Sequence, residues 1–536
     1  ASTYLLNIAW KHMEKEALNS SDTMEICKGK LKPINTTATT SGIVEEEEEE
    51  EEDEVEPLSP MGHIFHVPGL NYFIIAVLGC KTKIDVETIK YGIKQTLIKH
   101  PRFSSKLLFD AKDPTKPVAW IRSEVNVDDH LVVPDLDPNM DSPDQFVEDY
   151  LSNLTKYPFD LSKPLWELHI LNVKTKDAAG LGVFKIHHSL GDGVSLISLL
   201  LACARKSSDP NALPTLPVAR KKPAPTRISH SAGFLKCFLG SLMMAKVLWN
   251  SVVDIVLFLA TMVCLKDKND FTRYGSSHED GEQPPKRFVY KTFCFDDIKL
   301  VKNAMGVTVN DVVVGITQAG LSRYLNKKHG KDNGDPNHAL VNNLPKHIRL
   351  RAVLVMNLRS HTMIEGLAKR MEANTKVDWD WGNLVGYVLL PLHIGIKDDP
   401  LDYIRDAKAT IDRKKQSYEA QLSYSATKCF LNTLGLGVAV PLMHNSIGNT
   451  TLTFSNLVGP LEEVSFYGHP MAFLAPSFYG APQPLIVSFQ SYMDKMTVVV
   501  AVDEDIIPDP HNLCNEIVDS VILAKNAVIK RKLDNL

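Results

Sequence analysis

The sequence predicts a mixed α/β protein built from two halves, which are joined by a linker and an apolar segment. The chain has 536 residues, of which 44% are hydrophobic, so it can bury more than one core. Each half contains short apolar runs typical of strands and longer runs with the 3.6-residue periodicity of helices. Because these runs do not alternate regularly as strand, helix, strand, we do not expect a doubly wound parallel sheet.

Residues 1–56 are expected to form a disordered region. The acidic tract Glu45–Glu56 contains eleven acidic side chains and no basic one, and a block of like charges cannot bury apolar surface.

The opening residues lack the order of basic and apolar segments found in a secretory signal. The eight cysteines include no CxxC pair. We therefore expect reduced thiols facing the cytosol rather than a disulfide framework or a zinc ribbon.

Residues 57–205 are expected to form the first lobe. The run "GLNYFIIAVLGC" at 69–80 has the content of a buried strand. Asp85 is a suitable N-cap for a helix that continues to Lys99 and ends before Pro101. The remaining elements of this lobe are three strands and then an apolar helix, expected at 117–127, 167–173, 180–188 and 194–206.

Residues 206–285 are expected to form a linker and a membrane-associating segment. The linker is rich in Pro, Ser and basic residues. Residues 232–265 are the most apolar part of the chain, but Lys246 and Asp254 interrupt them. A spanning helix requires about 20 mostly apolar residues. We therefore favour a helix that lies in or dips into a membrane, with the upstream basic residues near anionic headgroups. The alternatives are a buried helix pair and a full span.

Residues 286–536 are expected to form the second lobe. It begins with a strand at 287–296, followed by a helix over 308–328 whose Thr308 and Asp311 fit a capping box. Three further strands and a hairpin that turns near Asp494 are expected at 350–360, 383–394, 451–460 and 484–507.

The stretch "KIHHSLGDG" at 185–193 carries the most specific chemistry. Adjacent residues on a strand point to opposite faces, so His187 and His188 cannot readily bind one metal ion, and we expect no metal site. Either both histidines simply pack at the end of the strand, or one imidazole faces an internal channel and acts as a base while the other packs in the core. Asp192 would hold the turn through a buried ion pair with an arginine, because an unpaired buried carboxylate is costly. Gly193 would permit an unusual backbone path.

The sequence contains no GxSxG elbow, Walker loop or HExxH motif, and "GLGVAV" lacks the third glycine of a dinucleotide-binding fingerprint. Without a recognisable serine or cysteine nucleophile, direct attack of one bound substrate on another is favoured over a covalent intermediate.

"HHSLGDG" resembles the HHxxxDG signature of acyl-CoA-dependent acyltransferases built like chloramphenicol acetyltransferase. More specifically, the chain is similar to the plant wax ester synthase/diacylglycerol acyltransferase family from about Pro57 to its C-terminus. Seven further stretches match the family, in the order in which the family has them. Six of them are "PLSP", "HPRFSS", "PLWELHIL", "TVNDVVV", "MNLRS" and "FSNLVGP", and the seventh is the stretch 468–484.

The resemblance implies two chloramphenicol acetyltransferase-like lobes with a channel between them, open to CoA on one side and to the acceptor on the other. It makes His188 the general base and His187 a supporting residue, with a packed strand residue as the alternative for His187. It implies that Asp192 is structural, with Arg359 of "MNLRS" as its partner, and that Gly193 permits the backbone path.

The same resemblance suggests substrate-binding residues. Asn310 and Asp311 match the Asn-Asp motif, although Asp311 can equally be a plain helix cap. Ser455 and Asn456 can offer hydrogen bonds to the oxyanion or to CoA. Trp166 helps to shape the acyl pocket, or it is simply a packing residue.

The expected activity is transfer of a fatty acyl group from acyl-CoA to a long-chain alcohol, with diacylglycerol as a further acceptor. Acyl-CoA is then a substrate, and no cofactor is needed. We expect contact with a membrane surface, no nucleic-acid partner, and a location at the endoplasmic reticulum with cytosolic lobes, or at the plasma membrane. The alternatives are acyl transfer to a small soluble alcohol or amine, and a non-catalytic lipid-binding protein.

Overall fold

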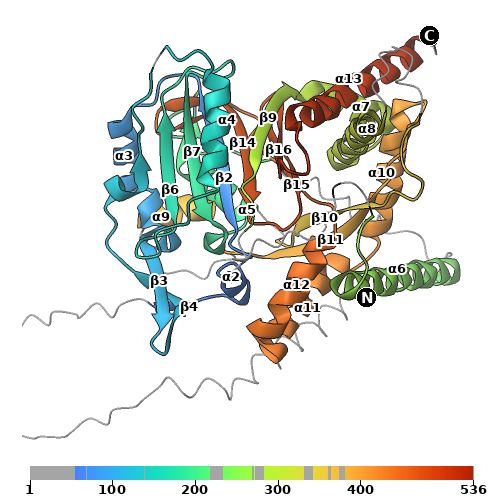
Figure 1. Ribbon diagram of the computed structural model, residues 1–536, viewed down its shortest axis with the longest axis horizontal. Coiled ribbons are helices and arrows are strands. Elements are labelled where there is room, and N and C mark those ends of the chain that lie inside the picture. Colours follow the sequence, from blue (N-terminus) through green and yellow to red (C-terminus); the bar gives the residue numbers. More distant parts are fainter. Residues whose placement is uncertain are drawn as a thin grey trace, which may run out of the picture. The chain divides into compact units, whose positions relative to one another are not determined.

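The computed structural model describes residues 55–67, 69–137, 139–217, 233–268, 271, 283–330, 342–359, 364–373 and 381–534 (Figure 1). The disorder expected for residues 1–54 lies outside these ranges. The expected boundary at residue 56 is wrong, because strand β1 (Val55–Pro57) pairs with β4 (Asp113–Arg122) in an antiparallel register. Glu56 also forms an ion pair with Arg102, so the end of the acidic tract belongs to the fold.

The first lobe contains a seven-stranded sheet among the described residues. Every neighbouring pair is antiparallel except β5 and β6. The strands follow the order β5 (Leu131–Val132), β6 (Trp166–Leu171), β7 (Gly180–His187), β2 (Phe73–Cys80), β14 (His469–Tyr479), β13 (Val464–Phe466), β8 (Ala204–Lys206).

Helices and a small second sheet complete this lobe. Asp85 caps helix α3 as expected, since its carboxylate accepts a hydrogen bond of 2.9 Å from the Thr88 amide. The helices are α2 (Pro60–Ile64), α3 (Val86–Gln95), α4 (Pro143–Leu154), α5 (Gly193–Ala202) and α9 (Ile364–Ala373), and β3 (Ser105–Asp110) joins β4 and β1 in the small sheet.

The second lobe contains a six-stranded mixed sheet among the described residues. Strands β10, β12 and β15 run parallel, and the outer pairs are antiparallel. The order is β11 (Val385–Leu392), β10 (Leu350–Asn357), β12 (Leu452–Leu457), β15 (Leu485–Tyr492), β16 (Lys495–Val502), β9 (Arg287–Cys294).

Helices cover one face of this sheet and part of the other face. One face packs in an apolar core on α7 (Phe295–Met305), α8 (Val309–His329), α10 (Pro400–Lys415) and α13 (Pro510–Asp534). Phe258 and Met262 of α6 (Gly233–Val263) pack on the other face with residues of α11 (Glu419–Leu434) and α12 (Leu436–Gly448). Thr308 caps α8 and completes the expected capping box with Asp311.

The predicted strands are present, but the assignment of sequence halves to lobes needs a correction. Strands β13 and β14 come from the second half of the sequence and belong to the first sheet, where β14 pairs along the whole of β2. Helix α9 also crosses over and packs on α5. The helix predicted over 194–206 ends at Ala202, and the chain then forms β8. Periodicity identifies a strand but does not identify the sheet to which it belongs.

The apolar segment forms one continuous helix, α6, rather than a buried helix pair. Within the described residues, Phe238–Val263 is the single helix that is long and apolar enough to cross a membrane by length and composition. The bent pair α7 and α8 passes the same test only when it is counted as one span, and α8 lies in the core of the second lobe.

Candidate active site

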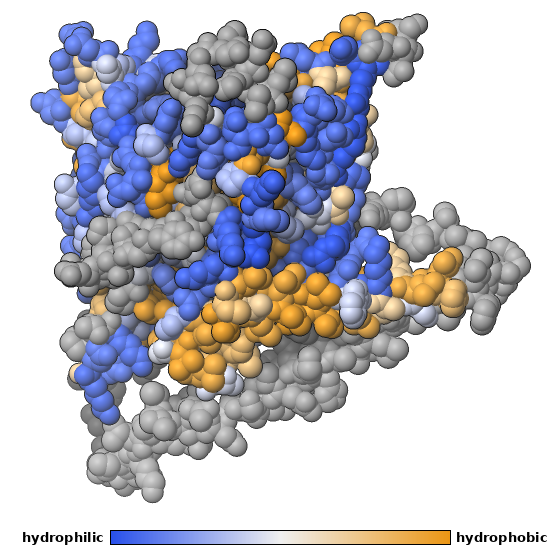
Figure 2. Space-filling model, turned by 45° about the vertical axis from the view of Figure 1, so that its right-hand side comes forward, coloured by the Kyte–Doolittle hydropathy of each residue, from blue (hydrophilic) through white to orange (hydrophobic). Residues whose placement is uncertain are grey.

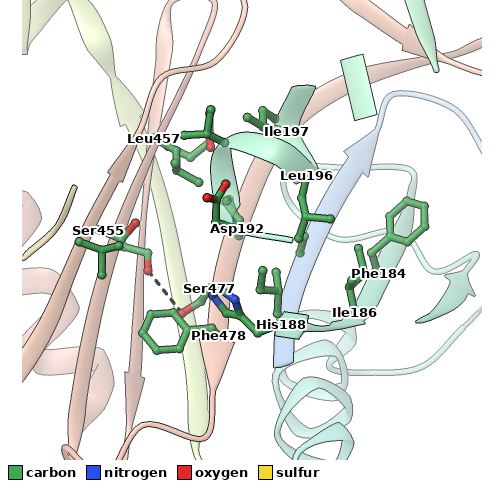
Figure 3. A pocket seen from close by; sticks show the side chains of 18 of the residues that line it. Phe184, Ile186, His188, Asp192, Leu196, Ile197, Ser455, Leu457, Ser477 and Phe478 are labelled. Carbon is green, nitrogen blue, oxygen red and sulfur yellow. Dashed lines mark hydrogen bonds between the residues drawn. The ribbon is translucent and has the colours of Figure 1, made fainter. Parts of the chain in front are cut away.

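A largely apolar pocket lies between the two sheets and reaches His188 (Figure 3). It encloses about 1740 Å³, including its open mouth. One wall comes from β2, α5 and β14, and the facing wall comes from β10, β11, β12 and β15. The polar side chains in this lining are few, among them His188, Ser455, Asn456, Ser477, Ser488 and Gln490.

His188 lies directly after β7, where the strand gives way to a short 3-10 turn. Its backbone amide donates to the carbonyl of Tyr72, 2.8 Å away, which fixes the residue against the start of β2. The half-buried imidazole is surrounded by aromatic rings, with the centroid of Phe65 at 4.7 Å and that of Phe478 at 6.5 Å. The ring is therefore held at the pocket wall in apolar surroundings.

Asn383 determines which nitrogen of His188 carries the proton. Its side-chain amide donates from Nδ2 to the His188 carbonyl at 2.9 Å, so its Oδ1 must face the ring, where Nδ1 lies 3.1 Å away. An amide oxygen only accepts hydrogen bonds, so Nδ1 carries the proton and Nε2 is left with a free lone pair. Burial lowers the pKa of His188 below 6.5, which keeps the ring neutral at physiological pH. This is the state that a general base requires.

His187 does not line the pocket. Its ring stacks on His66 with centroids 4.3 Å apart, and both nitrogens have partners, Ser189 Oγ at 2.6 Å and Asn71 Oδ1 at 3.0 Å. Burial also lowers the pKa of His187 well below 6.5. The two histidines are therefore separated, and the position of His187 agrees with the packed alternative rather than with a catalytic role. No three His, Cys, Asp or Glu side chains gather as a metal site anywhere in the described ranges.

Asp192 and Arg359 form the expected buried ion pair, with Oδ2 and Nη1 2.6 Å apart and both side chains at most 3% exposed. The carboxylate also accepts from the Ser195 amide at 2.9 Å, which caps α5, and from the Leu384 amide at 3.0 Å. Arg359 donates in addition to the Gly382 carbonyl at 2.6 Å. Because Asp192 belongs to the first lobe and Arg359 and Leu384 to the second, this network joins the lobes beside His188.

The sequence predicts that Gly193 permits an unusual backbone path, and this prediction is wrong. Gly191 is extended, with φ 168°, and Gly193 is the first residue of α5, so neither glycine adopts the left-handed region and the turn does not depend on their conformational freedom. What matters at Gly193 is space, since a Cβ there would lie 3.2 Å from the side chain of Leu457 across the lobe boundary.

The four second-lobe residues that were expected to bind substrate divide into two pairs. Ser455 and Asn456 of β12 line the pocket. Asn310 is exposed outside the pocket lining and accepts a hydrogen bond from Asn456. Asp311 is fully buried, and its carboxylate accepts from the Thr308 amide at 2.8 Å. Asp311 therefore caps α8, and a direct substrate contact is not supported by its position.

Trp166 is also placed differently from the expectation. Its side chain is fully buried, its Nε1 donates to the Phe103 carbonyl at 2.9 Å, and its ring stacks on His130. It does not belong to the pocket lining, and its ring packs in the core against Phe103, which does line the pocket and whose ring centroid lies 6.1 Å away. The packing alternative for Trp166 is the one that its position favours.

A second, more polar pocket of about 870 Å³ lies beyond Asn383. Asn383, Trp381 and Tyr424 line it, together with the basic side chains of Arg102 and Lys428. The Trp381 ring lies 4.1 Å from that of His100, and its Nε1 donates to the Leu190 carbonyl at 2.7 Å. The pair His188 and Asn383 thus separates an apolar pocket from a polar one.

Sequence reasoning missed Asn383 and Tyr72. Tyr72 is only 8% exposed and lines the apolar pocket, with its ring 6.4 Å from that of His188. Its hydroxyl is buried without a hydrogen-bond partner among the described residues. Burial raises the pKa of Tyr72 well above 10, so the hydroxyl remains a donor. Neither residue belongs to a recognisable catalytic motif, so only the contact geometry identifies them.

Comparisons with known proteins identify relatives of the chain over most of its length. A family model described as "Wax ester synthase/diacylglycerol acyltransferase catalytic domain" matches residues 61–313, and one described as "WS/DGAT C-terminal domain" matches residues 381–523. The chain is 46% identical over 486 residues to "Wax ester synthase/diacylglycerol acyltransferase 11" of Arabidopsis thaliana, which covers 90% of this chain and 96% of that protein.

The chain belongs to the wax ester synthase/diacylglycerol acyltransferase family. A second relative, "Wax ester synthase/diacylglycerol acyltransferase 5" of Arabidopsis thaliana, is 44% identical over 488 residues, which cover 89% of this chain and 95% of that protein. This wax ester synthase/diacylglycerol acyltransferase family member is thus an acyltransferase, as the HHxxxDG resemblance implied.

Solved structures confirm the expected fold. The wax ester synthase/diacylglycerol acyltransferase from Marinobacter aquaeolei VT8 superposes with a TM-score of 0.53 at 15% identity, covering 88% of this chain and 99% of that one. The first condensation domain of the calcium-dependent antibiotic synthetase also gives a TM-score of 0.53, at 12% identity, covering 88% and 96% of the two chains. The mixed α/β architecture of two chloramphenicol acetyltransferase-like lobes is therefore shared with this family.

Proposed function

We propose that this protein transfers a fatty acyl group from acyl-CoA to a long-chain alcohol, with diacylglycerol as a further acceptor. The observation that supports this most directly is the position of His188. Its Nε2 is unprotonated and lies at the wall of an apolar pocket between two lobes, in a fold that belongs to an acyltransferase family.

The proposed reaction is a direct transfer. Nε2 of His188 takes the proton of the acceptor hydroxyl, and the oxygen attacks the carbonyl carbon of the thioester. The tetrahedral intermediate then expels the CoA thiolate, which takes the proton back from the imidazolium. Asn383 Oδ1 accepts a hydrogen bond from Nδ1–H throughout, which stabilises the charged ring as it forms. No group of the protein becomes acylated, acyl-CoA is a substrate, and no cofactor takes part.

The developing oxyanion needs hydrogen-bond donors in the same pocket. The Tyr72 hydroxyl is the strongest candidate, because it is buried in the lining, remains protonated and has no partner among the described residues. Ser455 and Asn456 on the facing wall are further candidates. The donors would therefore come from both lobes.

The two pockets suggest how the substrates divide. Apolar side chains that line the larger pocket suit an alkyl chain. Arg102 and Lys428 in the smaller pocket suit the phosphates of CoA, because both are cationic donors. The thioester would then lie between the pockets, beside the pair His188 and Asn383.

We further propose that the protein works at a membrane surface, at the endoplasmic reticulum with both lobes in the cytosol, the plasma membrane being the other candidate location. The support comes from α6, whose outward side chains are apolar and exposed, including Met243 at 63% and Trp249 at 68%. Long-chain alcohols and diacylglycerol dissolve in membranes, so a membrane contact would bring the acceptor to the enzyme.

The test is an assay of the purified full-length protein with labelled palmitoyl-CoA and separate acceptors, hexadecanol, dioleoylglycerol and a small soluble alcohol. We expect labelled wax ester with hexadecanol and none above background with the His188→Ala variant. Product with the small alcohol alone would instead support a soluble acceptor. Saturable binding of palmitoyl-CoA, measured by a thermal shift, with no product from any acceptor would support a lipid-binding protein and overturn the proposal.

A further inference from the structure

Helix α6 is attached to the fold through one half only. From Asn250 onward it is held by buried polar contacts, in which Ser251 Oγ accepts from the Tyr418 amide at 2.9 Å and Asn250 donates to the Gln416 carbonyl at 3.1 Å. Asp254 is fully buried and forms an ion pair of 2.9 Å with Lys414 and a second one with Arg413.

The C-terminal end of α6 is held as firmly. Arg351 of β10 donates to the hydroxyl of Thr261 at 2.6 Å and to the Leu265 carbonyl at 2.7 Å, and it pairs with Asp267 just beyond the helix. Phe258 and Met262 pack on Val353 and Leu389 of the second sheet. This half of the helix is therefore fixed along the surface of the second lobe.

The other half of α6, residues 238–249, projects from the fold with most of its side chains exposed, and we call it the free half. All six residues from Phe238 to Met243 are exposed, and six consecutive residues cover more than one helical turn, so the helix is open on every side there. Six large apolar side chains are 51–68% exposed, namely Phe238, Leu239, Leu242, Met243, Leu248 and Trp249. Lys246 is the one charged residue of this half, and its long side chain can extend to the headgroups. The other side chains are apolar or small, so a helix exposed in this way requires an apolar environment, and a lipid layer supplies it.

The apolar surface continues beyond this free half. The fixed half of α6 exposes Val252, Val256 and Val263 on its outer side. Leu434 and Val438 of the neighbouring helices α11 and α12 are also exposed, by 46% and 51%. Figure 2 shows the apolar band that runs along this part of the surface.

The strand order shows that α6 does not cross the membrane. A single crossing would place the residues before and after α6 on opposite sides of the bilayer. Strand β2 precedes α6 and pairs over its whole length with β14, which follows α6. Asp192 and Arg359 likewise lie on the two sides of α6 in the sequence and are 2.6 Å apart. These contacts are incompatible with an intervening hydrocarbon layer of about 30 Å.

The length of the free half leads to the same conclusion. Its 12 or so residues are about 18 Å long as a helix, whereas a span needs about 20 apolar residues. Extending the span toward Val263 would draw Asp254 and its basic partners into the hydrocarbon. One leaflet contributes about 15 Å to the hydrocarbon thickness of about 30 Å. A helix about 18 Å long is only slightly longer, so it fits within one leaflet when it is tilted.

We propose that α6 is a single-leaflet anchor, in which its free half inserts into the lipid while both ends of the helix emerge on the same side of the membrane. This inference rests on the proposed membrane association and specifies its topology. The occupant of the apolar surface is the leaflet itself, and the fixed half keeps the lobes, with the pocket mouth between them, against the membrane that holds the acceptor.

The topology is tested with the full-length chain carrying different epitope tags at its two ends, inserted into sealed endoplasmic-reticulum microsomes. Flotation first measures membrane binding, and protease is then added outside. We expect the chain to float and both tags to be digested. A floating chain with one tag protected would overturn the single-leaflet anchor and leave membrane association intact. A chain that does not float would overturn both, while the acyltransferase assay in detergent tests the activity separately.

A matched pair of variants tests whether the free half makes the contact. The first carries Leu239→Glu, Met243→Glu and Trp249→Glu, and the control carries Tyr91→Glu, Ile522→Glu and Leu533→Glu, which are similarly exposed on α3 and α13. We expect the floating fraction to fall about tenfold or more in the first variant only, because charged groups are expelled from the leaflet. Thermal midpoints should remain unchanged in both, because none of these residues packs in a core. Equal flotation of the two variants would overturn the proposal.

Discussion

At the scale of single residues, the reactivity of His188 depends on contacts that hold its ring. Asn383 fixes the tautomer, Tyr72 and Phe65 supply the apolar surroundings, and burial lowers the pKa of the imidazole. A general base works only in its neutral form, so the rate falls as the pH drops through this pKa. The lowered value therefore extends activity to the acid side of 6.5.

The Asn383→Asp variant tests this arrangement through its pH profile. A carboxylate beside Nδ1 stabilises the charged imidazole and raises the pKa of His188. We expect the acid limb of the kcat/KM profile to move to higher pH, whereas Asn383→Ala should lower kcat by about 10- to 100-fold without such a move. An unchanged acid limb in Asn383→Asp would show that Asn383 does not contact the titrating ring.

The Tyr72→Phe variant tests the proposed oxyanion donor. The phenyl ring retains the packing of Tyr72 in the pocket lining, and the unpartnered hydroxyl is the one group removed. Loss of one oxyanion donor typically costs about 100- to 1000-fold in kcat. We expect kcat to fall toward this range, with KM for the alcohol and the thermal midpoint little changed. A kcat within about threefold of the unmodified enzyme would exclude this role.

The Asp192→Asn variant tests the buried ion pair. Removing the charge of one partner leaves the Arg359 guanidinium buried without its counterion, which costs about 3–5 kcal/mol in comparable pairs. We expect a lower free energy of unfolding in denaturant as well as lower activity. The control is Asp296→Asn, because Asp296 pairs with Lys299 on an exposed helix surface and should change stability by less than about 1 kcal/mol. Equal stability of the two variants would contradict the structural role.

At the scale of elements, β2 and α5 determine the shape of the apolar pocket. Alternate residues of β2, from Ile74 through Ala76 to Leu78, line it, together with Leu200 of α5 and Cys203 directly after α5. Tyr72 and Leu78 are six positions apart, which corresponds to about 20 Å of extended chain, so the pocket extends well beyond His188. Phe184, which pairs with Ala76, and Phe466 also line it, and their rings are 5.9 Å apart.

Ala76 lies midway along this wall, so the Ala76→Phe variant should shorten the pocket. We expect the rate with palmitoyl-CoA and hexadecanol to fall about tenfold or more, because a phenyl ring occupies the space of the distal alkyl carbons. The rate with hexanoyl-CoA and hexanol serves as the control and should change little. Equal losses for the long and short pairs would indicate a general folding defect instead of a limit on chain length.

At the scale of the whole molecule, the sequence predicts local structure better than it predicts assembly. The strands, the Thr308 capping box and the hairpin near Asp494 follow from short-range patterns, and the structure contains them. The pairing of Asp192 with Arg359 follows from the cost of an unpaired buried charge together with the family resemblance. The crossing of β13 and β14 into the first sheet and the contact of Asn383 with His188 join distant parts of the chain, and no local pattern encodes them.

This crossing predicts that the two sequence halves cannot fold separately. A first fragment ending in the basic linker near residue 225 lacks β14, so the edge of β2 loses its partner and is open to aggregation. We expect this fragment to be insoluble alone, whereas co-expression with residues 226–536 should give a complex that copurifies, unfolds in one cooperative transition and makes wax ester. The measurements are solubility, copurification through a tag on one fragment, and thermal unfolding. A first fragment that is soluble and unfolds cooperatively alone would show that β2 does not need β14, and the lobes would then be independent folding units.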